Sequence, residues 1–131
     1  MTRKTIKQRI SEMDSFTHGY MTAMIWTECN PDNLSLKHKT EKDLSHQALD
    51  TIFEDCKDFQ ESNKVYLDQT GIHSPLYSEE DAGHDFWLTR NGHGAGFWDR
   101  GLGTIGQELT KNSHAYGEQH LYVGFSSRLY I

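Results

Sequence analysis

Cysteine and proline are scarce in this chain, and it contains no long apolar run. Two cysteines and two prolines occur among 131 residues, and no segment approaches the roughly 18 consecutive apolar residues of a membrane span. Cys29 and Cys56 lack CxxC spacing, so we expect two buried free thiols in a reducing compartment. The basic N-terminus lacks the apolar segment of a signal peptide. These absences predict an intracellular protein that does not enter a membrane.

Positive charge is also in short supply. The chain carries 13 Lys and Arg against 19 Asp and Glu, which gives a formal net charge of −6. Proteins that bind nucleic acids generally are usually basic, so the balance argues against DNA or RNA as a partner. The two signs are interspersed along the chain, which favours solubility over mimicry of DNA as the reason for the acidic excess. Aromatic residues make up 11% of the chain, so large rings should supply much of its core.

Apolar residues recur at helical spacing through the first half of the chain. One helix is predicted to begin after Asp14 or Ser15, either of which can act as its N-cap. A longer helix is predicted over residues 41–63, where Thr40 begins a capping-box sequence and apolar residues follow at three- and four-residue steps. The polar residues 69–82 are expected to form a long surface loop.

Residues 84–100 are unusual because two aromatic-rich segments flank a glycine-rich centre in the sequence HDFWLTRNGHGAGFWDR. The Asn-Gly pair within it is the dipeptide that type I′ turns favour, because both central residues of such a turn have positive φ. We therefore predict a β-hairpin in which residues 85–90 form one strand, residues 91–94 turn, and residues 95–99 return.

A short helix and a second hairpin are predicted after this stretch. Thr104 would be the N-cap of the helix and Gly117 its C-cap, and the two strands would occupy residues 121–124 and 128–131. Residues 101–106 match the letters of a dinucleotide-binding loop, G-x-G-x-x-G. No βαβ unit can follow so late in the chain, so a nucleotide site is not predicted there.

This order of elements predicts an α+β fold. The N-terminal helices would pack on a small antiparallel sheet built from two hairpins that flank a short helix. The length fits a single domain over residues 1–131, with a helical part at 1–67 and a hairpin–helix–hairpin part at 83–131.

The candidate binding residues lie in the first predicted hairpin and just after it. Tryptophan and arginine are enriched in protein-binding hot spots, and glycines beside a histidine let a partner approach the backbone. We expect a binding surface formed by Trp87, Arg90, His93, Trp98, Asp99 and Arg100. The alternative is that both tryptophans are buried in the core, and this alternative is favoured more for Trp87 than for Trp98.

Eight histidines raise the question of a metal site. Neutral imidazole and carboxylate groups are ligands for zinc and other divalent metals. The groups that would have to converge are His84, His93, His114 and His120, with Asp85 or Asp99. No HxH, HExxH or CxxC spacing brings any of them together, so neither a metal nor a cofactor is predicted.

Residues 83–124 also carry a resemblance to a family. The stretch GHDFWLTRNGHGAGFWDR, followed by AYG at 115–117 and LYVG at 121–124, resembles small uncharacterised tailed-bacteriophage proteins. Members of that family usually continue after the last strand with an acidic-glycine turn, where this chain has Phe-Ser-Ser. The resemblance implies a phage gene product that acts in the cytoplasm of a bacterial host, and it transfers no catalytic residue.

Two functions follow from these features. Because no catalytic signature is present, we favour a small phage-encoded accessory protein that binds a host protein and inhibits or redirects it. A counter-defence role against a restriction or CRISPR component is plausible by analogy. The alternative is a small enzyme or ligand-binding protein, with or without a metal. In that alternative an anionic metabolite or nucleotide would bind in a pocket formed by His93, Asp99, Arg90 and Arg100.

Overall fold

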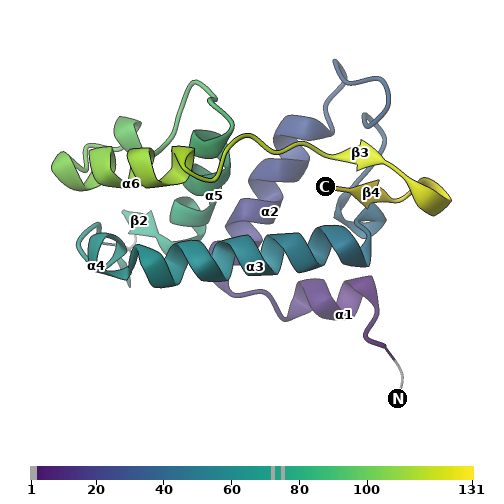
Figure 1. The fold of residues 1–131 in the computed structure, drawn as a ribbon, viewed down its shortest axis with the longest axis horizontal. Helices are drawn as coiled ribbons and strands as arrows, with labels where there is room; N and C mark the ends of the chain where they lie inside the picture. The colour runs from purple at the N-terminus through teal and green to yellow at the C-terminus, as the bar shows by residue number, and fades with distance from the viewer. Residues whose placement is uncertain (1–2, 72, 75) are drawn as a thin grey trace.

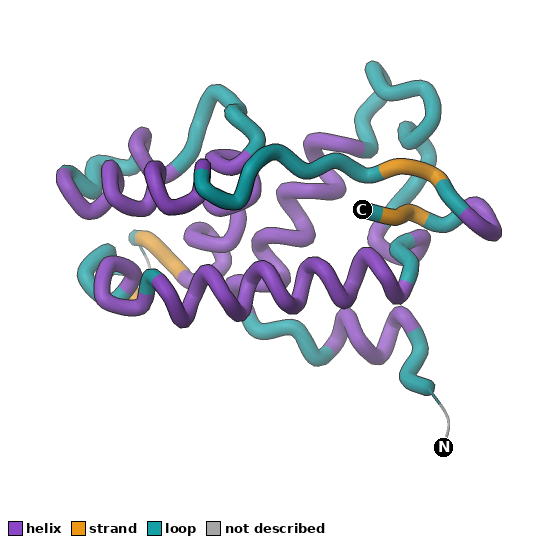
Figure 2. The backbone as a smooth tube through the Cα atoms, viewed as in Figure 1, coloured by secondary structure: helices purple, strands orange, loops and turns teal. Residues whose placement is uncertain are grey.

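The computed structural model describes residues 3–71, 73–74 and 76–131. Among the described residues, helices dominate and strands occur as two short antiparallel pairs (Figures 1 and 2), so the fold is α+β in the broad sense. The helices are α1 (Ile6–Ser11), α2 (Ser15–Glu28), α3 (His46–Ser62), α4 (Lys64–Leu67), α5 (Glu79–Arg90) and α6 (Thr104–His114). The short 3₁₀ turns are η1 (Glu41–Asp43), η2 (Phe97–Asp99) and η3 (Phe125–Ser127). The strands are β1 (His73–Ser74), β2 (Tyr77–Ser78), β3 (Tyr122–Val123) and β4 (Leu129–Tyr130).

The two N-terminal capping predictions are confirmed, although one of them belongs to a shorter element. The Asp14 carboxylate caps α2 by accepting a backbone N–H at 2.8 Å. Thr40 does form a capping box, but this box caps the N-terminus of the 3₁₀ turn η1 and not that of the long helix. The chain then extends through Leu44, and Ser45 caps α3 separately. The predicted single helix is interrupted because the N–H of Ser45 donates to the carbonyl of Leu129 in β4, at 2.9 Å.

Helices α2 and α5 cross in direct backbone contact at a pair of glycines. A Cβ added at Gly19 would collide with the carbonyl oxygen of Glu80, and one added at Gly83 would collide with that of Phe16. Aromatic rings surround this crossing, and the rings of Phe59 and Phe86 stack with their centroids 4.0 Å apart. The hydrophobic core therefore lies where α3 covers the crossing of α2 and α5.

The first predicted hairpin is wrong, because residues 79–90 form helix α5. Ser78 and Asp81 make a capping box at its start, and acidic side chains fill its first turn, which favours a helix N-terminus. The Asn-Gly pair ends the helix instead of turning a hairpin. Asn91 is its C-cap, and Gly92 follows with a φ of 67°.

The second predicted hairpin is confirmed in its essentials. β3 pairs with β4 in antiparallel register, with Tyr122 opposite Tyr130, and η3 supplies the connection. The predicted helix before it is α6, but both predicted caps are wrong: Gly103 is the N-cap and Ala115 is the C-cap. Gly117 lies beyond the helix with a φ of 75°. In Figure 1, α3 spans the molecule, with α4 and α6 towards one end and the β3–β4 hairpin at the other.

The predicted loop 69–82 is only partly a loop. It contains the short pair β1–β2 and the first turn of α5, while its positions 72 and 75 lie outside the described residues. Both cysteines are free thiols, as predicted, with Cys56 buried and Cys29 half-buried. Burial, assisted by Glu28, raises the pKa of Cys29 to about 11. Across the described ranges, no helix combines the length and the apolar character that crossing a membrane requires.

Candidate functional site

Trp87 belongs to the core. Its side chain is fully buried, with a relative exposure of 0%, and its indole N–H donates to the Thr27 hydroxyl at 2.7 Å. Its ring also meets the Tyr20 ring edge-on, with centroids 5.4 Å apart. The alternative prediction for this tryptophan is therefore the correct one, and Trp87 offers no surface to a partner.

Arg90 is a buried residue whose side chain links several helices. Its guanidinium forms an ion pair with Asp55 of α3 at 2.8 Å and donates to the Tyr20 hydroxyl of α2 at 3.0 Å. It also donates to the carbonyl groups of Tyr116 and Gly117, at 2.9 and 2.8 Å, in the segment after α6. One buried side chain thus ties α2, α3 and the α6–β3 connection to α5. These contacts leave it unavailable to an anionic ligand.

The guanidinium of Arg100 forms an ion pair with a different carboxylate. It pairs through Nε and Nη2 with Asp85, whose side chain is only 1% exposed, at distances of 2.8 to 3.1 Å. The Tyr77 hydroxyl donates to the same carboxylate at 2.7 Å. Asp99 is exposed on η2, and Trp98 beside it is 45% exposed. The four groups of the predicted anion pocket are therefore not assembled into one site.

His93 lines a depression in the surface that is separate from the one lined by Arg100. A groove of about 520 Å³ lies between the C-terminal turns of α2 and α5 and the loop after α5. Its lining consists of Trp26, Thr27, Asn30, Leu88, His93, Gly94 and Ala95, and we call it the Trp26 groove. Its size falls within the range of about 300–1,000 Å³ that is usual for ligand sites.

Trp26 gives the groove its most accessible apolar surface. Its side chain is 68% exposed, and its ring lies beside that of His84, with centroids 6.3 Å apart. Leu88 and Ala95 supply apolar surface opposite, so a bound side chain would be removed from water on several sides.

The polar groups of the groove differ in whether they are free to hydrogen-bond to a ligand. The Thr27 hydroxyl donates to the carbonyl of Ala23 at 2.8 Å and accepts the indole N–H of Trp87, so it is not free to act as a nucleophile. The backbone N–H of His93 donates to Leu88 at 3.0 Å. No hydrogen bond to the imidazole of His93 is made by any described residue, so its ring can hydrogen-bond to a ligand.

The sequence prediction omitted Trp26, although the helix pattern contained it. Phe16, Tyr20 and Met24 mark the buried face of α2. Trp26 follows Met24 by two positions, which on a helix places it about 200° around the axis from that face. A large aromatic residue on the side of the helix away from Phe16, Tyr20 and Met24 is the feature that indicates it.

The histidines are dispersed. In the parts of the chain that the structure describes, no three His, Cys, Asp or Glu side chains lie close enough to hold a metal ion. The structure separates the candidate ligands, for example His120, which pairs with Glu28 at 3.0 Å, and His84, which lies against Trp26.

No family model, no curated protein and no solved structure matches this chain. The chemistry of the groove is therefore the basis for inferring function. An exposed indole, an apolar floor and a free imidazole suit non-covalent binding, and the lining contains neither a carboxylate nor a thiol.

Proposed function

We propose that this chain is a small binding protein that docks on a partner protein through the Trp26 groove. The observation that carries the proposal is a tryptophan left 68% exposed above an apolar groove. Tryptophan buries about 150–250 Å² when it is fully covered, and it is among the residue types most enriched in binding hot spots. Covering Trp26 would therefore contribute more to binding than covering any polar side chain of the lining.

The groove also indicates which chemistry the partner presents. Leu88 and Ala95 form an apolar floor that suits an aliphatic or aromatic side chain projecting from the partner. The His93 imidazole beside them can make one hydrogen bond to the partner's backbone or to a polar side chain. Such an apolar anchor with one polar contact is typical of hot spots on protein surfaces.

The biological setting of the proposal rests on the resemblance of residues 83–124 to tailed-phage proteins. In that setting the partner is a protein of the bacterial host, and binding inhibits or redirects it. A component of host defence is one such target by analogy. The alternative of a pocket for an anionic metabolite has less support, because Arg90 and Arg100 are both paired with internal carboxylates.

The proposal is tested by recovering the partner from host lysate and measuring its affinity for three versions of the protein. Trp26→Ala should weaken binding by about 30-fold, the effect of a typical hot spot of about 2 kcal/mol. Trp98→Ala is the matched control, because it removes an exposed tryptophan that does not line the groove, and it should change the affinity by less than about threefold.

Two results would count against this function. If Trp26→Ala bound the partner like the wild type, the groove would not be the docking surface. If Trp98→Ala instead abolished binding, the surface around η2 would be the binding site. Circular dichroism of each variant separates a lost contact from a lost fold.

A further inference from the structure

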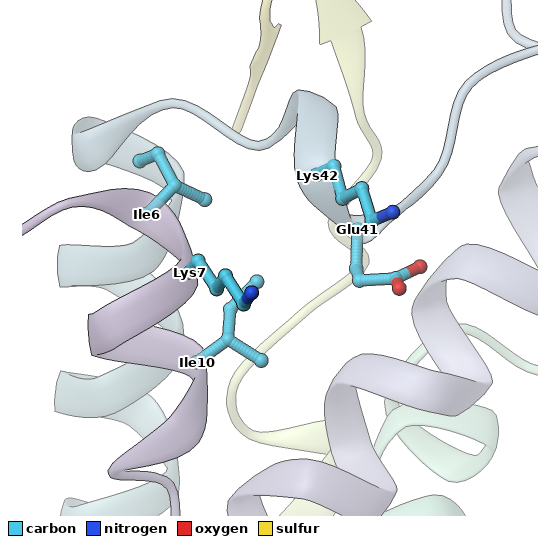
Figure 3. A pocket seen from close by; sticks show the side chains of 5 residues that line it. All are labelled: Ile6, Lys7, Ile10, Glu41 and Lys42. Atoms are coloured by element: carbon cyan, nitrogen blue, oxygen red, sulfur yellow. The ribbon is translucent and has the colours of Figure 1, made fainter.

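A second depression, which shares no residue with the Trp26 groove, lies between α1 and the 3₁₀ turn η1. This α1 cleft has a volume of about 550 Å³ and is lined by Ile6, Lys7, Ile10, Glu41 and Lys42 (Figure 3). We infer that the α1 cleft binds an amphiphilic monoanion, a single carboxylate carried on an unbranched apolar chain.

The floor of the cleft is apolar. Ile6 and Ile10 lie one turn apart on α1, so their side chains share one face of the helix. Both are only partly buried where they pack against the edge of the core. An apolar chain laid along this face would cover the surface that they leave in water.

Two ammonium groups stand beside this floor without an acidic partner. Elsewhere in the described residues, some lysines and arginines pair with carboxylates, as in Lys4–Glu12, Arg9–Asp50, Lys64–Asp68, Arg90–Asp55 and Arg100–Asp85, and others, such as Lys57 and Lys111, do not. In this part of the chain, neither Lys7 nor Lys42 has a carboxylate within 4.0 Å. Both lysines that line the apolar cleft can therefore pair with an anionic ligand.

The third charged group of the lining sets the charge that the ligand should carry. Glu41 precedes Lys42 on η1, and Figure 3 shows Lys7 and Ile10 reaching from α1 towards this turn. Two ammonium groups and one carboxylate give the lining a formal charge of +1. A single carboxylate complements that charge, whereas a doubly charged phosphate monoester would face excess repulsion from Glu41.

Both walls of the cleft are fixed from outside it. Arg9 holds α1 against α3 through an ion pair to Asp50 at 2.6 Å. On the other wall, the guanidinium of Arg128 donates to the carbonyl oxygens of Lys42 and Leu44, at 2.7 and 2.8 Å. A cleft whose walls are held by bonds that the ligand does not touch needs little ordering on binding.

The test is calorimetric titration of the full chain with decanoate, kept below its micelle concentration, and with 1-decanol. Decanoate should bind and 1-decanol should bind several-fold more weakly. Octanoate should bind about 15-fold more weakly than decanoate, since each buried methylene contributes about fourfold. Equal binding of the acid and the alcohol would overturn the inference, and so would no binding of decanoate at millimolar concentration.

Charge variants distinguish the α1 cleft from non-specific binding of a detergent-like molecule. Lys7→Gln and Lys42→Gln should each weaken decanoate binding by about threefold, the size expected for a partly exposed ion pair. Glu41→Gln should tighten it, because the opposing carboxylate is removed. Lys111→Gln, on the exposed side of α6, is the matched control and should have no effect. If the three cleft variants matched this control, the proposed site would be wrong.

Discussion

Helices α2 and α5 meet in two different ways. At Gly19 and Gly83 their backbones touch, with no room for even a methyl group between them. Towards their C-terminal turns, Trp26 and Leu88 line an open groove instead. The same pair of helices thus provides a rigid crossing and, about two turns away, a surface that a partner can fill. Glycines allow the close approach at the crossing, and the larger side chains of Trp26 and Leu88 line the groove beyond it.

The two tryptophans on these helices show the same contrast. Trp87 is fully buried and hydrogen-bonded to Thr27, whereas Trp26, the neighbour of Thr27 in sequence, is 68% exposed. One position along a helix turns a side chain by about 100°, which is enough to move it from the core to solvent. Within one turn of α2, one side chain therefore contacts the core while its neighbour is open to solvent.

The largest effect is expected from filling the crossing. Gly83→Ala would gain about 1 kcal/mol in helix propensity. Its methyl group, however, would collide with the backbone of Phe16, which cannot rotate away as a side chain can. We expect a net loss of about 3 kcal/mol or more in the free energy of unfolding, measured by urea denaturation.

Gly94→Ala is the control for this variant, because a Cβ at Gly94 meets no atom within 4 Å. It should change the free energy of unfolding by less than about 0.5 kcal/mol. If both variants were equally stable, the backbone contact at the crossing would not be as close as described.

A smaller effect is expected from raising the pH. Burial raises the pKa of Tyr20 far above its ordinary value of 10.0, and the nearby Arg90 offsets this only in part. Above pH 10 the unfolded chain loses this proton while the folded chain keeps it, so deprotonation favours unfolding. Stability should be intact below about pH 10 and should then fall by about 1.4 kcal/mol per pH unit for this group.

The measurement is the urea midpoint at pH values between 8 and 11. Tyr20→Phe should make the alkaline decline shallower, because the titrating hydroxyl at the crossing is gone. Trp26→Ala should leave the slope as it is in the wild type. An unchanged slope in Tyr20→Phe would mean that Tyr20 does not carry the alkaline instability.

The smallest effect on stability is expected at the groove. Trp26→Ala should change the free energy of unfolding by no more than about 0.5 kcal/mol, because the indole packs little in the folded chain. The same substitution should remove most of the tryptophan fluorescence that acrylamide quenches easily. A loss of several kcal/mol would show that Trp26 is part of the core packing, and the groove would then lose its role.

The elements that were predicted correctly depend on neighbours in sequence. Asp14 caps α2, Thr40 forms its capping box, and the C-terminal hairpin turns through Phe-Ser-Ser. The helix over residues 79–90 was missed although Ser78 and Asp81 carry the same capping-box pattern that was recognised at Thr40. The two aromatic-rich segments and the Asn-Gly pair favour a hairpin as a pattern, but in the folded chain the Asn-Gly pair terminates a helix.

The candidate site was predicted only in part, because the sequence does not show which of its side chains are exposed to solvent. His93 does line the groove, whereas Trp87 and Arg90 are buried in the interior. Arg90 and Arg100 were predicted as free cations, and each is bound to a carboxylate. Asp55 lies 35 positions before Arg90, so no local pattern identifies it as the partner.

By itself the sequence determined the caps, the C-terminal hairpin, the free thiols and the aromatic character of the core. These features depend on hydrogen bonds, φ values and composition within a few residues. Only the tertiary structure decided which tryptophan is covered, which arginines are neutralised and where grooves remain. Burial and ion pairing depend on segments that are far apart in the chain and meet only after folding, so the same Trp or Arg can be core or surface until its neighbours are in place.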